Sequence, residues 1–322
     1  MAGSHSRERT ALIVTVLNEA HSIDALLDSV AAQTVRPDEL VLADGGSTDR
    51  TLEHVRQWSA RLPLKVLSVP GANISRGRNA AIAATDAELI AVTDAGVRLD
   101  REWLARLQAQ MRSEVDVVSG FFVADPHSLF ERALGATTLP DVSDIDPHRF
   151  LPSSRSVLFR KAVWQKVGGY PEWLDYCEDL VFDLALRRRG CRFRFAPDAV
   201  ARFRPRSTLA AFGRQYYLYA RGDGKADLWR ARHAIRYAAY VLMVRLLLKR
   251  SRARWLLPVG VIAYTRRPVQ RLQLGRLGWR ERPIAIGLVP LIRLVGDLAK
   301  MLGYPVGVLW RVRSGWTSRS LS

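Results

Sequence analysis

The chain has 322 residues, 48% of them hydrophobic, which is enough for a sizeable core and argues against wholesale disorder. Its two cysteines, Cys177 and Cys191, exclude a disulfide framework and lack zinc or redox spacing, so we expect a reducing, cytoplasmic environment. The net charge of +18 lies almost entirely in residues 230–322, which hold 19 Lys and Arg against two acidic residues. This asymmetry predicts a near-neutral globular domain over 1–229 and a basic region over 230–322 with a polyanionic partner.

The first 95 residues alternate strand-like and helix-like segments. Helical spacing of apolar residues follows the first two strands, and a further helix is predicted over 78–84, entered through Gly77. This alternation predicts an α/β fold with a mainly parallel, doubly wound sheet. The strands are predicted over residues 11–17, 39–43, 65–69 and 89–93.

The middle of the chain predicts mixed structure. Residues 135–155 hold three prolines and several Asp and Ser, which indicates a loop. Strands are predicted over 115–123, 157–159 and 192–196, and helices over 161–167 and 178–189.

Beyond residue 234, short apolar runs are bounded by arginines. None reaches the 18 or so uncharged residues of a membrane-spanning helix, although snorkelling arginines leave a tilted or re-entrant helix over 284–310 open. We predict a set of amphipathic helices at a membrane interface. The runs are 238–244, 255–265, 284–292 and 301–310.

Two polyanionic partners compete for this basic region. A nucleic-acid-binding arm would fit the basic clusters at 249–252 and 266–267. The interleaved Val, Leu, Ile, Trp and Pro suit a bilayer better, because a free arm of this composition would be insoluble. We therefore expect an anionic membrane surface and no nucleic acid. The positive-inside tendency places the chain at the cytoplasmic face of the membrane.

Polar motifs follow three of the predicted strands: Asn18-Glu19, the segment 44–49, and Asp94-Ala95-Gly96. In open α/β sheets ligands bind outside the carboxyl ends of the strands, so these motifs predict one shared crevice. The segment 44–49 is equally compatible with a turn in which Ser47 or Thr48 caps the next helix. A strand-terminal Asp94 can likewise be a turn former.

A further acidic pair, Glu178-Asp179, opens a predicted helix. Acids in a first turn are favoured by the helix dipole, which is the structural explanation. Asp179 and Asp183 share one helix face, however, and neighbouring carboxylates raise each other's pKa, which suits a general base.

Two basic segments are candidates for binding phosphate. Arg76 and Arg78 lie near a predicted helix start, which forms either a phosphate site or a solvated basic turn. Residues 214–225 combine tyrosines with the cations Arg221 and Lys225, and form either a pyrophosphate clamp or a helix with a Tyr/Leu core face.

Together these residues resemble a family 2 glycosyltransferase of the GT-A fold over about residues 10–225. The resemblance implies transfer of a sugar from a nucleotide-diphosphate sugar to an acceptor hydroxyl with inversion, without an organic cofactor. With the basic region, it implies a lipid-linked or cell-envelope glycan acceptor. The motifs are 15–19, 44–49, 77–81, 94–96 and 178–179.

The resemblance also assigns roles by position. Asp179, with Glu178 beside it, would be catalytic, with Asp179 as the general base. Glu19 and Asp44 would contact the nucleoside, and Asp94 the ribose or a metal. The residues implied to bind the nucleotide-sugar are Val16, Asn18, Glu19, Asp44, Arg76, Arg78, Asp94, Ala95, Arg221 and Lys225.

The sequence departs from the family at two metal-ligand positions, where Gly96 replaces an Asp and Arg202 a His. Loss of two ligands weakens a Mg²⁺ or Mn²⁺ site on Asp94. Arg202, Arg221 or Lys225 would then neutralise the leaving diphosphate, so we expect reduced or absent metal dependence.

Two other functions stay open. A GT-A-like nucleotidyltransferase would usually have a Gly-rich loop after the first strand, where this chain has Leu17–Ala20. A non-catalytic membrane module that binds a nucleotide-sugar is favoured by Gly96 and Arg202 and disfavoured by the intact Glu178-Asp179.

Overall fold

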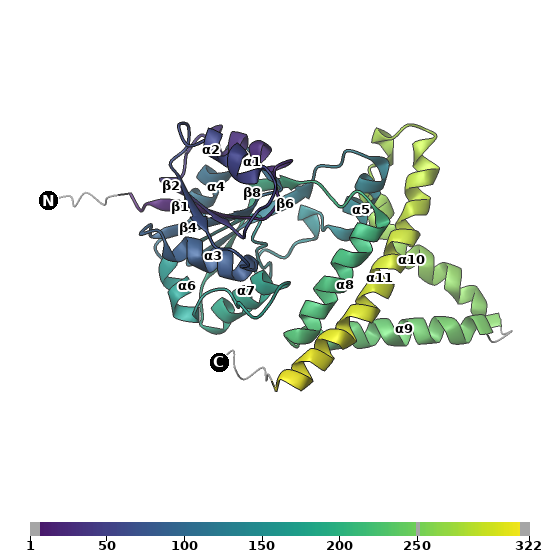
Figure 1. The fold of residues 1–322 in the computed structure, drawn as a ribbon. Coiled ribbons are helices and arrows are strands. Elements are labelled where there is room, and N and C mark those ends of the chain that lie inside the picture. Colours follow the sequence, from purple (N-terminus) through teal and green to yellow (C-terminus); the bar gives the residue numbers. More distant parts are fainter. Residues whose placement is uncertain (1–6, 249–251, 316–322) are drawn as a thin grey trace. The chain divides into compact units, whose positions relative to one another are not determined.

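The computed structural model describes residues 7–248 and 252–315, so most of the predicted basic cluster at 249–252 lies outside the described residues. By packing, the chain forms two compact units, both drawn in Figure 1. The first comprises residues up to 123 with 142–203, and the second comprises 124–141 with the residues from 204 onward. The functional boundary at residue 229 stays a prediction; it falls inside the second packing unit.

The first unit is built on an eight-stranded sheet in the order β3-β2-β1-β4-β7-β6-β8-β5. The strands from β3 to β4 in this order are parallel, whereas β7 is antiparallel to both of its neighbours and β5 is antiparallel to β8. The α/β fold is therefore confirmed, with a mixed sheet. The strands are β1 (Thr10–Val16), β2 (Glu39–Asp44), β3 (Leu64–Ser68), β4 (Leu89–Asp94), β5 (Val97–Leu99), β6 (Val117–Ala124), β7 (Val157–Arg160) and β8 (Phe193–Phe203).

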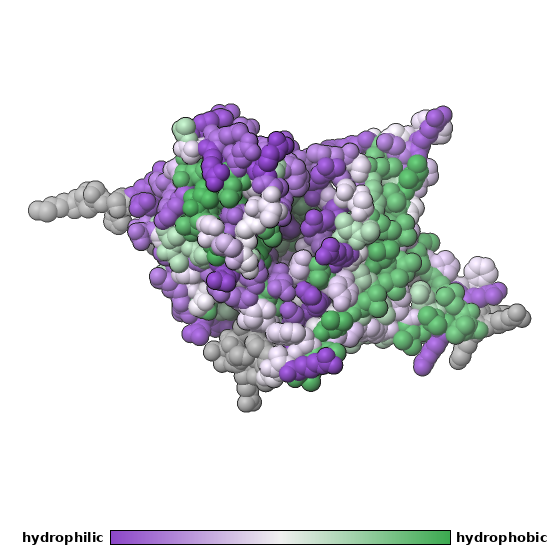
Figure 2. Space-filling view, viewed as in Figure 1, coloured by the Kyte–Doolittle hydropathy of each residue, from purple (hydrophilic) through white to green (hydrophobic). Residues whose placement is uncertain are grey.

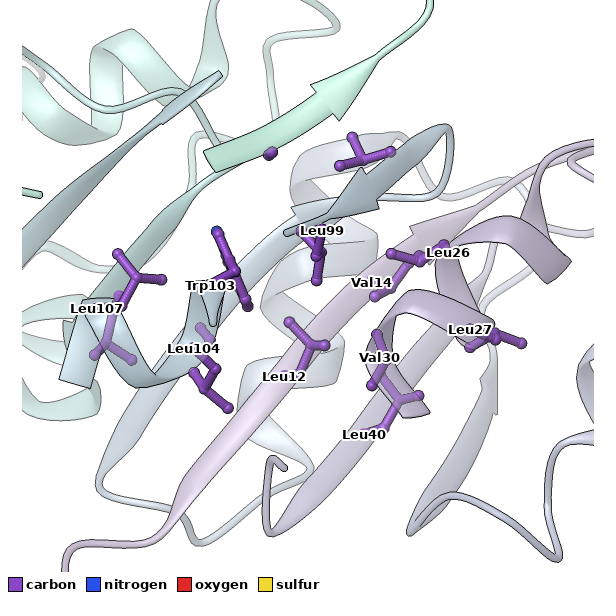
Figure 3. Packing of buried hydrophobic residues seen from close by; sticks show 14 of the residues in the cluster. Leu12, Val14, Leu26, Leu27, Val30, Leu40, Leu99, Trp103, Leu104 and Leu107 are labelled. Atoms are coloured by element: carbon purple, nitrogen blue, oxygen red, sulfur yellow. The ribbon is translucent and has the colours of Figure 1, made fainter. Parts of the chain in front are cut away.

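Helices cover both faces of this sheet (Figure 1). Leu12 and Val14 of β1 pack on one face with Trp103, as Figure 3 shows, while Ala11 and Ile13 pack in a second cluster on the other. Burial on both faces explains why β1 is continuously apolar rather than alternating. The helices are α1 (Ile23–Ala31), α2 (Thr51–Gln57) and α4 (Trp103–Gln110) with the first cluster, and α3 (Ile74–Ala83), α6 (Lys161–Val167) and α7 (Glu178–Arg188) with the second.

The predicted start of α3 at residue 78 was wrong. The helix begins at Ile74, and the Asn73 side chain accepts a hydrogen bond of 2.9 Å from the Arg76 amide as its N-cap. Gly77 is therefore inside the helix, where it permits close contact with β1: a Cβ there would lie 3.0 Å from Cγ2 of Thr15. In the sequence, this contact glycine is indistinguishable from a helix boundary.

Two other boundaries differ from the prediction. Strand β8 continues past residue 196 because its second half pairs with β5, from which it is distant in sequence. A helix, α5 (Leu129–Thr138), extends into the segment that was predicted to be a loop from residue 135. Both extensions depend on tertiary packing rather than on local pattern.

The second unit is helical. The sequence left a single helix over 284–310 open, and one 34-residue helix, α11 (Glu281–Ser314), does contain both apolar runs, 284–292 and 301–310, together with Pro290 and Pro305. Within the described residues, no helix combines the length and the hydrophobicity needed to cross a bilayer. Besides α5, the other helices are α8 (Leu209–Lys225), α9 (Arg230–Leu248) and α10 (Leu256–Arg271).

Glycines bring α8 and α11 together backbone to backbone. A Cβ on Gly303 or Gly307 of α11 would overlap the backbone of Tyr217 or Arg221 of α8, and one on Gly224 of α8 would overlap Tyr304. The spacing of Gly303 and Gly307 places both on one helix face.

A buried carboxylate joins the remaining helices to α11. Asp297 accepts hydrogen bonds from Arg236 Nε of α9 at 2.8 Å, from the Tyr264 hydroxyl of α10 at 2.8 Å and from the Tyr240 hydroxyl of α9 at 3.2 Å. Satisfying the charge in this way offsets the cost of its burial.

We expect Gly307→Val to lower the melting temperature of the full chain, because overpacking a tight contact costs about 1–3 kcal/mol. Gly287→Ala is the matched control on the same helix, since a Cβ there meets nothing within 4 Å and should be neutral or stabilising. Melting in detergent checks both variants. Equal melting temperatures for Gly307→Val and the wild type would contradict the packing described.

Candidate active site

The carboxyl ends of β2, β1 and β4 lie side by side, as expected from the sequence. In the strand registers, Val16 pairs with Asp44 on one side of β1, and Thr15 pairs with Asp94 on the other. The two aspartates thus flank the end of β1, where ligands bind in open α/β sheets.

Asn18 and the segment 44–49 form one hydrogen-bonded loop pair. Asn18 has a left-handed backbone, with φ of 56°, and its side-chain oxygen accepts the Thr48 amide at 2.8 Å. The Glu19 amide donates to the Thr51 hydroxyl at 2.7 Å. Asp49 accepts from the Thr51 hydroxyl, and this hydrogen bond outweighs desolvation and lowers the pKa of the Asp49 carboxyl. The loops after β1 and β2 therefore hold each other in place.

Asp44 is buried and organises its own turn. Its carboxylate accepts the backbone amides of Gly46 and Ser47 at 3.1 Å each. The alternative in which Ser47 or Thr48 caps the next helix was wrong, because α2 begins at Thr51 without a side-chain cap. The role of Asp44 in nucleoside binding stays a prediction.

A buried arginine is the centre of the site. The Arg78 side chain is only 2% exposed; its NH1 donates to Glu178 Oε1 at 2.7 Å and its NH2 to Asp94 Oδ1 at 2.9 Å. The guanidinium also lies 5.3 Å from the centre of the Tyr170 ring. Arg78 therefore links α3, the end of β4 and the start of α7, and its partners are carboxylates.

A second arginine, Arg155, approaches the outer oxygen of Asp94. Its Nε lies 3.5 Å from Oδ2, and its side chain is 24% exposed. No sequence motif points to Arg155, because this residue lies in the segment before β7, which is distant in the chain from Asp94. Only the antiparallel pairing of β7 with β4 brings the two together.

The acids at the start of α7 differ in environment. Burial is the main cause that raises the Glu178 pKa to about 7; the Asp179 charge adds to the rise and Arg78 opposes it. Burial also raises the pKa of Asp183 well above its ordinary value, with Asp179 adding to the rise. Asp179 is only half-buried, so it is the acid of this group that can meet an acceptor.

Asn79, which follows Arg78 in α3, fixes the helix to another segment. Its side-chain oxygen accepts the Tyr170 amide at 2.8 Å and the Trp164 indole at 3.0 Å, and its nitrogen donates to the Tyr170 carbonyl at 2.9 Å. Arg76 is exposed and lines a hollow of about 580 Å³ with Asn79 and Trp164. Of these two consecutive residues, Arg78 therefore contacts the acids of the site, whereas Asn79 binds α3 to the segment around Trp164 and Tyr170.

The other predicted residues occupy different environments. The side chains of Val16 and Ala95 are buried in the hydrophobic core beside the site, so only their backbones can face a donor. Arg221 and Lys225 lie on α8 in the second unit, where the Lys225 ammonium is 4.7 Å from the centre of the Trp310 ring. Their roles at a diphosphate stay predictions.

The residues around Asp94 do not fit a divalent cation. Both Asp94 oxygens already face arginines, and Gly96 supplies no ligand. Arg202 is ion-paired to Asp100, with distances of 2.6 and 3.1 Å. Across the part of the chain that the structure describes, no group of three His, Cys, Asp or Glu side chains is arranged to hold a metal.

The raised pKa of Glu178 predicts a pH-dependent stability. The native state holds this proton to a higher pH than the unfolded chain, so the stabilisation is present below about pH 4.5 and is lost as the pH rises to about 7. The melting temperature of the wild type relative to Glu178→Gln should therefore fall between pH 5 and pH 8. If the melting temperature of the wild type instead rises relative to that of Glu178→Gln over this range, the Glu178 pKa is not raised.

Comparison with known proteins places the chain in a family. The family model described as glycosyl transferase family 2 matches residues 11–165, and that described as glycosyl transferase family group 2 matches residues 89–304, more than half of the chain.

Two curated relatives align with about two thirds of their own length. The succinoglycan biosynthesis protein ExoA of Rhizobium meliloti is 28% identical over 229 residues, covering 66% of this chain and 68% of ExoA. The O-antigen chain rhamnosyltransferase RfbN of Salmonella typhimurium is 22% identical over 209 residues, covering 60% of this chain and 66% of RfbN.

Solved structures share the fold. A mannosyltransferase from Pyrobaculum calidifontis, in complex with GDP-Man and Mn²⁺, has a TM-score of 0.64 at 20% identity, over 92% of this chain and 88% of its own. S. aureus TarS 1–349 in complex with UDP has a TM-score of 0.52 at 20% identity, over 96% and 92% of the two chains. The family match, the GT-A-like sheet and the acidic motifs at its strand ends agree, and the chain belongs to glycosyltransferase family 2.

Proposed function

We propose that this enzyme transfers a hexose, with inversion, from a nucleotide-diphosphate sugar to an acceptor hydroxyl. The observation that carries the proposal is the Asp94–Arg78–Glu178 bridge, which holds Asp179 near the strand ends where a donor binds. The relatives act in the same chemistry: RfbN is named a rhamnosyltransferase, and solved neighbours were captured with GDP-Man and UDP-GlcNAc.

The geometry divides the acidic pair between two tasks. Glu178 is buried and holds Arg78, so it is a positioning residue. Asp179 takes the proton of the acceptor hydroxyl as the acceptor oxygen bonds to the anomeric carbon. The bond from that carbon to the diphosphate breaks on the opposite face, so the configuration inverts and the electron pair leaves with the diphosphate.

The side chains around Asp94 favour little or no dependence of the activity on Mg²⁺ or Mn²⁺. Two arginines occupy the carboxylate that would hold a metal, and cations aimed at developing charge supply equivalent electrostatic stabilisation. A metal fitted here would have to displace Arg155 from Asp94.

We propose that the acceptor is a lipid-linked or cell-envelope glycan met at the cytoplasmic face of a membrane. The second unit exposes many apolar side chains, which Figure 2 shows gathered over its helices. Exposed tryptophans beside arginines suit a headgroup interface, and the +17 charge of residues 230–322 suits anionic lipid. The apolar residues of this unit that are more than 60% exposed are Ile235, Leu247, Leu248, Trp255, Leu256, Val259, Ile262, Trp279, Leu302 and Val312.

Binding and turnover test the catalytic proposal. In a panel of UDP-, GDP- and dTDP-sugars, the cognate donor at 100 times its Kd should stabilise the protein by about 2.7 kcal/mol, and nucleoside diphosphate should be released. Asp179→Asn should slow release by about 10²–10⁴-fold without loss of donor binding. Asp198→Asn, exposed on β8, is the matched control. Binding without turnover would instead indicate a non-catalytic module, and a loss below about tenfold would exclude Asp179 as base.

Vesicle sedimentation tests the membrane proposal. The full chain should bind vesicles that contain anionic lipid and stay bound at high salt, because the exposed tryptophans add apolar contact. Replacing Trp255 and Trp279 by serine should weaken this binding. A matched control replaces the exposed Val66 and Val142 of the first unit by serine. Complete release by salt would show that the attachment to the vesicles is purely electrostatic and would contradict the apolar contact proposed here.

A further inference from the structure

The two oxygens of the Asp94 carboxylate are held by different arginines. Arg78, on Oδ1 at 2.9 Å, is buried and shared with Glu178. Arg155, on Oδ2 at the longer distance of 3.5 Å, is 24% exposed. Of the two, Arg155 is therefore the arginine that reaches the open side of the site, where a donor would lie.

Several contacts orient Arg155. Its carbonyl accepts the hydroxyl of Thr93, the residue before Asp94, at 2.8 Å, and its NH1 donates to the Ser153 hydroxyl at 3.3 Å. Its guanidinium carbon lies 4.5 Å from the centre of the Phe203 ring and 5.9 Å from that of Phe122. These contacts fix a partly exposed positive charge beside Asp94, and a guanidinium is a group that phosphate oxygens pair with.

The neighbouring positions agree with this assignment. Arg202, the other cation near the expected metal ligands, is ion-paired to Asp100 through two nitrogens. Gly96 leaves room beside Asp94, since a Cβ built on it meets nothing within 4 Å. The site has therefore lost a carboxylate that would hold a metal and gained a positioned cation on the carboxylate that remains.

We propose that Arg155 contacts the donor diphosphate and takes the place of a metal ion. This inference rests on the proposed function. As the bond between the anomeric carbon and the diphosphate breaks, its electron pair stays on the diphosphate oxygen, and the Arg155 guanidinium stabilises that charge. No proton or oxidant is needed for this step. Asp94 holds Arg155 in position.

The test compares Arg155→Met and Arg155→Lys with the wild type, all in EDTA. Loss of one hydrogen-bond donor that stabilises developing charge typically lowers kcat about 10²–10³-fold. The kcat of Arg155→Met should therefore fall by an amount in this range, and Arg155→Lys should retain more activity. Arg160→Met is the matched control, because Arg160 is 22% exposed and lies at the far end of β7. Melting temperatures identify any variant that fails to fold.

Binding provides a readout apart from turnover. Titration of the full chain with a nucleoside and with its diphosphate gives the affinity contributed by the two phosphates. Arg155→Met should reduce that contribution about tenfold or more while nucleoside affinity stays within twofold. A purely structural role would weaken both ligands together.

A double variant tests the exchange of cation for metal. Gly96→Asp with Arg155→Met restores a second carboxylate where there is room for it, and should recover diphosphate affinity and turnover only when Mn²⁺ or Mg²⁺ is added. The same metals should not rescue Arg155→Met alone.

The outcomes separate the two proposals. A wild type that neither binds nor turns over any donor would overturn the proposed function. Wild-type activity that is abolished by EDTA, or a turnover of Arg155→Met within fivefold of the wild-type turnover, would overturn the role of Arg155 and leave the proposed function standing.

Discussion

The first unit depends on one buried charge, the Arg78 guanidinium. It points inward from α3 to two carboxylates that come from the end of β4 and the start of α7. Removing one partner of a buried ion pair typically costs about 3–5 kcal/mol, because the other charge is left uncompensated. The orientation of Asp94, of Glu178 and through it of Asp179 is thus set by a residue that itself faces no solvent.

The second unit also contains a buried charge, but there it is a carboxylate. Asp297 is one of only two acids in residues 230–322, and it is buried among Arg236, Tyr240 and Tyr264. Glycine contacts on α11 hold α8, and this carboxylate holds α9 and α10. The apolar side chains left exposed are therefore a property of helices that are already packed, which supports a lipid interface over unpacked structure.

A carboxylate such as that of Asp94 can pair with either of two kinds of cation. Its oxygens suit a hard divalent ion when further oxygen ligands are close, and a guanidinium when they are not. In this chain Gly96 and Arg202 remove the further ligands, and the β4–β7 pairing delivers Arg155. In the mechanism that we propose, the Arg155 guanidinium would stabilise charge on the leaving diphosphate, as a metal ion would.

The sequence by itself determined the α/β fold of the first unit, the family and the strand-end motifs, because apolar period and turn residues are local properties. It misplaced the start of α3, left open whether residues 284–310 form one helix, and missed Arg155 altogether. Gly77 resembles a boundary until β1 is seen beside it, and the prolines and polar residues of α11 resemble breaks until α8 covers one face. Tertiary structure alone decided that Arg78 is buried between carboxylates, because ion pairs between residues 16 and 100 positions apart leave no periodic trace in a sequence.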